Sequence, residues 1–142
     1  MDDVVLEFLG VDYGSRVIGV ARINTLAKIG EPLNPIRATD DADAVQQLES
    51  LCHSQNYDAV VIGLPRNLEG NDTQQTEIVR KFALKVKENL ETTVYLVDEA
   101  GSTVEARARI GNKQVSLDSV SAVVILENFI SHADKKSLEV GA

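Results

Sequence analysis

The stretch LGVDYGSRVIGVARI, residues 9–23, consists of two apolar runs that meet at a polar turn. The first run ends in Asp12, the chain turns at Gly14, and the second run begins at once. A link of this length joins antiparallel strands, and the apolar runs on either side indicate that both strands are buried. A lone carboxylate at the edge of such a ribbon is compatible with a turn residue and with a metal or phosphate site.

Three more segments outside this hairpin are predicted to be strands. Residues 28–37 form an apolar run that Pro32 and Pro35 interrupt, which favours a strand at the edge of a sheet. Residues 58–64 and 93–98 are short apolar runs typical of buried strands. The first three strands are expected to be antiparallel, and those joined through helices are expected to be parallel.

Apolar residues at helical spacing follow three capping signals. The acidic stretch at residues 39–41 precedes the first predicted helix, Asp72 with Gln75 resembles a capping box before the second, and Ser116 precedes the last. A short additional helix is expected to begin near residues 102–105. The resulting order, βββαβαβα, predicts an α/β fold with a five-stranded mixed sheet and helices on both faces.

The composition favours one globular domain. The 142 residues include 44% hydrophobic and 25% charged residues, with a net charge of −8 and one cysteine, Cys52. We expect a single domain over residues 1–142 with a frayed tail at about 133–142. A single cysteine excludes a disulfide within the chain and a cysteine-based zinc cluster. No apolar run is long enough for a membrane span. The acidic N-terminus lacks the basic region of a signal peptide. These features favour a cytoplasmic protein that does not coat nucleic acid through its net charge.

Acidic residues gather where the predicted strands end. Asp12 ends the first strand, Asp98 and Glu99 end the fifth, and Asp118 lies in the first turn of the last helix. The carboxyl ends of parallel strands share one edge, and strand alternation allows only one of Asp98 and Glu99 to face Asp12. Each acid alone is compatible with a solvated turn, strand-end or helix-start residue. Together they indicate a site for two Mg²⁺ or Mn²⁺ ions that supports phosphodiester cleavage.

Basic residues in the loops provide the other half of such a site. Arg16, Arg66 and Lys113 are the candidates for contacts with phosphate groups because they lie in loops near the predicted edge. His53 and His132 fall on helices away from that edge, which argues against a histidine-based zinc hydrolase. Aromatic residues make up only 4% of the chain, so base-stacking platforms are not expected.

Five motifs in order resemble the YqgF family of bacterial proteins, which are described as pre-16S rRNA nucleases or Holliday-junction-resolvase-like proteins and are similar to ribonuclease H in fold. The resemblance extends over about residues 6–131. The motifs are LGVDYGSRVIGVA, EPLNPI, VIGLPRNLEGNDTQQTEIVRKFALKVKENL, VDEAGSTVEA and LDSVSAVVILENFI.

The resemblance implies catalytic and metal-binding roles for Asp12, Glu99 and Asp118, with Asp98 as a neighbouring support. It also implies Mg²⁺ or Mn²⁺ as cofactor and maturation of the 5′ end of 16S rRNA as the function. Ala100 stands where the family has an arginine, so a phosphate contact of the family is missing here.

The expected partners are precursor 16S rRNA or another structured nucleic acid and ribosomal particles, with no membrane, for a monomer or homodimer. A resolvase of four-way DNA junctions and a non-catalytic RNA or ribosome-maturation adaptor are the alternatives. ATP binding is disfavoured, because the related kinases need two such domains and this chain holds one.

Overall fold

The computed structural model describes residues 4–99, 116–131 and 138–139. Within these ranges one mixed sheet has seven strands, arranged in the order β3-β2-β1-β5-β6-β7 with β4 paired to β2. The strands are β1 (Glu7–Asp12), β2 (Val17–Asn24), β3 (Glu31–Pro32), β4 (Ile36–Arg37), β5 (Ala59–Leu64), β6 (Thr93–Asp98) and β7 (Leu138–Glu139).

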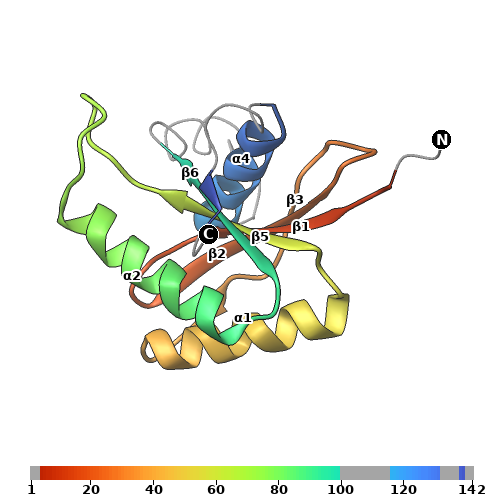
Figure 1. Ribbon diagram of the computed structural model, residues 1–142, viewed down its shortest axis with the longest axis horizontal. Helices are drawn as coiled ribbons and strands as arrows, with labels where there is room; N and C mark the ends of the chain where they lie inside the picture. The colour runs from red at the N-terminus through yellow and green to blue at the C-terminus, as the bar shows by residue number, and fades with distance from the viewer. Residues whose placement is uncertain (1–3, 100–115, 132–137, 140–142) are drawn as a thin grey trace.

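Helices cover both faces of this sheet (Figure 1). The helices α1 (Asp41–Gln55) and α2 (Gln74–Asn89) lie on one face, and α4 (Leu117–Ser131) lies on the other. The alternation of β5 shows why both faces are apolar: Val60 and Ile62 pack toward α1 and α2, whereas Ala59 and Val61 pack toward α4. A strand buried on both faces must be apolar at every position, as this one is.

The pairing of the strands agrees with the prediction. The hairpin β1–β2 is antiparallel, and β1, β5 and β6 run parallel to one another. Val11 on β1 pairs with Ile62 on β5, and Leu64 at the end of β5 pairs with Asp98 on β6. The carboxyl ends of the three parallel strands therefore lie at one edge of the sheet, here called the carboxyl edge.

Side-chain caps fix where the helices begin. Asp40 caps α1, as predicted, by accepting a hydrogen bond from the backbone N–H of Asp43 at 2.8 Å. The cap of α2 is Thr73 and not Asp72, which was expected there, because the Thr73 and Thr76 hydroxyls form the reciprocal capping box. Ser116 accepts from the backbone N–H of Ser119 at 3.3 Å, in agreement with its predicted role before α4.

Three expectations about the minor elements are corrected or fall outside the description. The predicted strand over 28–37 is two short strands, β3 and β4, separated by the segment that contains Pro35. Leu138 and Glu139, predicted to be frayed, instead pair antiparallel with β6, so the sheet has more strands than the five predicted. The short helix expected near residues 102–105 lies outside the described residues. No helix in the described ranges has the length and apolarity that crossing a membrane requires.

Candidate active site

Asp12 occupies the end of β1 at the carboxyl edge, where its carboxyl group is largely buried. Four causes together raise the pKa of Asp12 to about 8: in decreasing order they are burial, the charge of Glu99, a hydrogen bond with Glu99 and the charge of Asp118. At neutral pH the protonated Asp12 carboxyl group therefore donates a hydrogen bond to Glu99. The three acids predicted from the sequence are neighbours in the fold.

Glycine at position 63 gives Glu99 the room to reach Asp12. Gly63 lies on β5, the strand between those that lead to Asp12 and Glu99. A Cβ atom at this position would come within 2.5 Å of Ile125 Cδ1 and 2.9 Å of Glu99 Oε2. Because the glycine has no side chain, the Glu99 carboxyl group lies over β5. The Glu99 backbone N–H also donates to the carbonyl of Leu64 at 3.2 Å, which continues the pairing of β5 and β6 past Asp98.

Asp98 points to a different neighbour from Glu99. Its carboxylate accepts a hydrogen bond from Arg66 Nε at 2.9 Å, and its side chain is 51% exposed. The alternation of side chains along β6 thus separates two adjacent acids, one beside Asp12 and one at the surface. The expected division of Asp98 and Glu99 between two environments agrees with these contacts.

Asp118 lies in the first turn of α4, and this helix brings it to the site. A Cβ atom at Gly19 would overlap the backbone carbonyl of Asp118, so α4 packs directly on the backbone of β2. Gly19 is also the residue that pairs with Asp12 across the β1–β2 hairpin. The glycine therefore brings the first turn of α4 close to the end of β1.

The donor set at the carboxyl edge fits a hard divalent cation, because Asp12, Glu99 and Asp118 offer only carboxylate oxygens. The fit is incomplete in one respect. Across the described ranges, no three His, Cys, Asp or Glu side chains are already placed to hold a metal ion. Asp12 and Glu99 are in contact, whereas the charge of Asp118 is the smallest of the four causes that raise the pKa of Asp12. Of the two neighbouring acids, Asp118 is therefore the one less strongly coupled to Asp12.

The basic candidates are differently placed. Arg16 is exposed in the turn between β1 and β2, close in sequence to Asp12. Arg66 is 25% exposed, and its Nη1 contacts the Asp72 carboxylate at 2.9 Å in addition to the bond from Nε to Asp98. Lys113, the third candidate, and Ala100 lie outside the described residues.

Sequence reasoning missed the groups that support the acids. Tyr13, next to Asp12, donates from its hydroxyl to Asp41 Oδ1 at 2.6 Å and packs on Phe82 with ring centroids 4.5 Å apart. Burial and the Asp41 contact raise the pKa of the Tyr13 phenol to about 12, so it remains a hydrogen-bond donor. This contact ties the end of β1 to the start of α1, and the DYG triplet gave only a turn signal for it.

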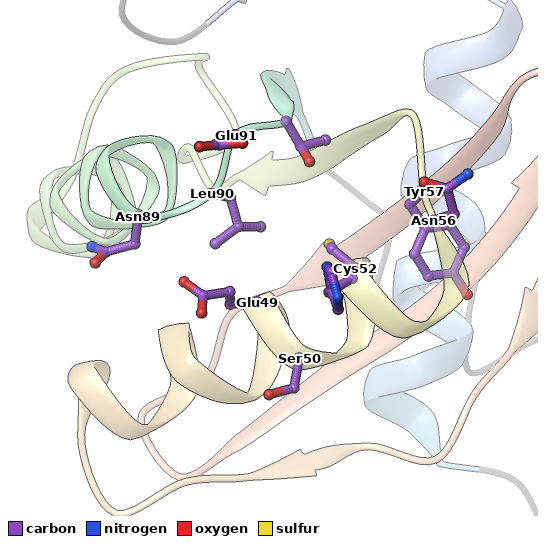
Figure 2. Close-up of a pocket in the computed structure, with 10 residues that line it drawn as sticks. Glu49, Ser50, Cys52, Asn56, Tyr57, Asn89, Leu90 and Glu91 are labelled. Atoms are coloured by element: carbon purple, nitrogen blue, oxygen red, sulfur yellow. The ribbon is translucent and has the colours of Figure 1, made fainter.

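A cavity lies at the opposite end of the parallel strands. It has a volume of about 720 Å³ and is found between the ends of α1 and α2 and the starts of β5 and β6 (Figure 2). Cys52 lines it, and burial raises the pKa of this thiol to about 11, so the thiol stays protonated and unreactive at neutral pH. His53 also lines it, on α1 and away from the carboxyl edge, as predicted. His132 lies outside the described residues.

Comparisons with known proteins agree with the predicted fold and family. The family model RuvX, described as Holliday junction resolvase, matches residues 6–132. A relative from Alcanivorax borkumensis named "Putative pre-16S rRNA nuclease" is 36% identical over 125 residues, which cover 87% of this chain and 94% of that protein. A relative of the same name from Enterobacter sp. (strain 638) is 40% identical over 129 residues, covering 85% and 93%.

Solved structures share the fold at low sequence identity. Thermus thermophilus RuvC in complex with a Holliday junction substrate aligns with a TM-score of 0.62 at 11% identity, covering 94% of this chain and 99% of that one. A second RuvC structure from the same organism aligns with a TM-score of 0.61 at 12% identity, covering 95% and 100%. The predicted ribonuclease H-like architecture is thus confirmed.

Proposed function

The chain belongs to the RuvX family, and from this premise we propose that it is a divalent-metal-dependent endonuclease that cleaves phosphodiester bonds in structured RNA. The proposed substrate is the 5′ end of the 16S rRNA precursor in the cytoplasm, with ribosomal particles as the setting. The names of the curated relatives support the choice of RNA. Mg²⁺ or Mn²⁺ is the proposed cofactor, because the acids at the carboxyl edge offer oxygen ligands alone.

One observation carries this proposal: a buried carboxyl group, Asp12, is in contact with a second, Glu99, and within electrostatic reach of a third, Asp118. Clustering acids at a buried position destabilises the fold when they ionise, so the cluster needs a function to explain it. Asp12, Glu99 and Asp118 would hold a divalent cation, which would supply activation of a water molecule and stabilisation of the leaving oxygen of a phosphodiester.

The residues of the chain prepare the site in three ways. Asp12 holds a proton at neutral pH, which a cation bound beside Glu99 would displace to solvent. Glu99 is oriented by its backbone hydrogen bond to Leu64 and by the space at Gly63. Arg66, held by Asp98 and Asp72, and the exposed Arg16 are proposed to contact the phosphate groups that flank the scissile bond.

The net charge of −8 makes these local contacts important. A protein with this charge repels a polyanion at long range, so binding depends on bound cations and on arginines placed at the site. Lys113 is proposed as a third phosphate contact from its place in the sequence.

A second candidate function is the resolution of four-way DNA junctions. The description of the matching family model favours it, whereas the names of the curated relatives favour RNA. A resolvase that makes symmetric cuts would act as a dimer, so the mass of the protein in solution separates these two functions from each other. A non-catalytic adaptor for ribosome maturation would bind RNA and leave it intact.

The test is a cleavage assay with Mn²⁺ on a precursor 16S 5′ leader and on a four-way DNA junction, using wild type, Asp12→Asn and Asp118→Asn. We expect the wild type to cut the RNA and both variants to lose that activity. Cleavage of the junction alone would favour the resolvase, and binding of RNA without cleavage of either substrate would favour the adaptor. Full activity in both variants would contradict the proposed site.

A further inference from the structure

The hydroxyl of Ser119 attaches the first turn of α4 to the sheet. Ser119, the residue after Asp118, is completely buried at 0% exposure. Its hydroxyl donates to the backbone carbonyl of Leu33 at 2.7 Å and accepts from the backbone N–H of Val20 at 3.4 Å. The Leu33 N–H in turn donates to the Val20 carbonyl at 2.9 Å. One hydroxyl therefore links α4, β2 and the segment that follows β3.

The surroundings of Ser119 make this link specific. Most of the helix is buried among apolar residues, whose contacts have no fixed direction. Leaving a buried hydroxyl without hydrogen-bond partners destabilises the fold by about 1–3 kcal/mol. The hydrogen bonds of Ser119 therefore favour one position of the helix on the sheet. Gly19 provides the space at the same point by letting the Asp118 backbone touch β2.

The position of the first turn of α4 on the sheet determines where Asp118 lies relative to Asp12. Val20 is adjacent to Gly19, and Gly19 pairs with Asp12 across the hairpin. The chain of contacts from Ser119 to Asp12 thus passes through backbone atoms of one strand pair, with no long side chain in between. We propose that Ser119 is a positioning residue, which fixes the first turn of α4 on β2 beside Asp12 and thereby sets where the Asp118 carboxylate can approach Asp12 and Glu99 when a cation binds.

This inference rests on the proposed function, because it concerns the binding of the proposed cation. Ser119 touches neither the cation nor the substrate and acts through Asp118. Residues that orient metal ligands typically contribute about 10-fold to 100-fold to metal affinity. The proposal therefore predicts a change in affinity for the ion that exceeds any change in the rate at saturating ion.

The experiment measures Mn²⁺ affinity of the full chain by electron paramagnetic resonance at a temperature where each variant is fully folded. Ser119→Ala is expected to bind Mn²⁺ about 10-fold more weakly than wild type. Ser119→Cys, which keeps a weak donor of similar size, is expected to lie between the two. The matched control is Ser121→Ala, which removes another buried serine hydroxyl from the same helix two residues away and is expected to bind as the wild type does.

Cleavage provides a second reading of the same variants. In Ser119→Ala the Mn²⁺ concentration for half-maximal cleavage rises about 10-fold, while the rate at saturating Mn²⁺ stays within about two-fold of wild type. A serine that only stabilised the fold would lower the melting temperature and leave the Mn²⁺ affinity of the folded protein unchanged.

Three results would overturn the inference, and they differ in whether they also overturn the proposed function. Equal Mn²⁺ affinity in wild type and Ser119→Ala would refute the positioning role and leave the proposed function standing. Absence of Mn²⁺ binding in the wild type would refute the proposed function, and the positioning role with it. Equal weakening in Ser119→Ala and Ser121→Ala would show a general effect of loosening α4 and would also refute the specific role of Ser119.

Discussion

The two ends of the parallel strands differ in what they offer to a ligand. The amino ends border a cavity of about 720 Å³, where Glu49 and Glu91 are exposed to solvent. The carboxyl ends lie beside a tight cluster in which Asp12 is buried against Glu99 and its pKa is raised to about 8. The cavity and the acids with a perturbed pKa thus lie at opposite ends of the strands. The acids, and not the cavity, indicate the candidate site.

The largest effect expected from this difference is on stability as a function of pH. The pKa of Asp12 is higher in the folded chain than in the unfolded chain. The stability that the protonated carboxyl group contributes is therefore fully present below about pH 4 and is lost as the pH rises toward 8. The loss reaches about 4 kcal/mol at pH 7 as an upper value, from about 1.4 kcal/mol per pKa unit. In a chelating buffer, Asp12→Asn should therefore exceed the wild type in stability by much more at pH 8 than at pH 5.

Chemical denaturation at the two pH values measures this effect, and Glu49→Gln is the control from the cavity end. The exposed Glu49 is expected to give the same difference from wild type at both pH values. If Asp12→Asn behaved as Glu49→Gln does, the contrast between the two ends of the sheet would be refuted.

The response to cations should separate the adjacent acids at the end of β6. Mg²⁺ or Mn²⁺ at 100 times its dissociation constant should stabilise the wild type by about 2.7 kcal/mol. Glu99→Gln should abolish this gain, because it removes the carboxylate beside Asp12. Asp98→Asn should keep most of it, because Asp98 contacts Arg66 instead. Thermal melts with and without metal measure the gain, and the reverse pattern in the two variants would contradict the assignment.

Two glycines that pack against α4 provide a sharper comparison. A Cβ atom at Gly63 would meet Ile125 and the Glu99 carboxyl group, whereas one at Gly30 would meet Val123 Cγ1 at 2.7 Å. Both Gly63→Ala and Gly30→Ala should destabilise the fold by about 1–3 kcal/mol through overpacking. Only Gly63→Ala should also lose the stabilisation by Mn²⁺, because only there is a site carboxylate displaced. Loss of that stabilisation in both variants, measured by thermal melts, would show that crowding of α4 alone is responsible.

The smallest expected effect concerns the arginine at the carboxyl edge. If Arg66 contacts a phosphate, Arg66→Gln should lower the slope of log affinity against log salt for RNA by about one unit. Arg22→Gln is the control, because Arg22 is also paired with a carboxylate, Glu31 at 2.7 Å, on strands away from this edge. Binding titrations at several salt concentrations measure both slopes, and equal slopes in the two variants would argue against a phosphate contact by Arg66.

The sequence predicted the architecture because its signals are local and consistent with one another. The apolar runs around Asp12 specify a buried hairpin, and the connection through helices specifies parallel strands. These two facts alone place Asp12 and the end of β6 at one edge of the sheet. Strand alternation then limits the choice between Asp98 and Glu99 to one residue of the pair.

The supports of the site could not be predicted in the same way. Gly19 and Gly63 matter because of what approaches them from α4 and β6, and a sequence contains no record of that approach. Ser119 resembles any helical serine until its partners, Val20 and Leu33, are known from the fold. The cap at Thr73 was missed because Asp72 offers an equally good local signal, and the tertiary position of the loop decides between them.

The most direct test of the central claim is anomalous diffraction from crystals of the protein soaked in Mn²⁺. We predict an anomalous peak at the carboxyl edge, with Asp12 and Glu99 among its ligands. The cavity lined by Glu49 and Glu91 should show none. A peak in that cavity with none beside Asp12 would contradict the account.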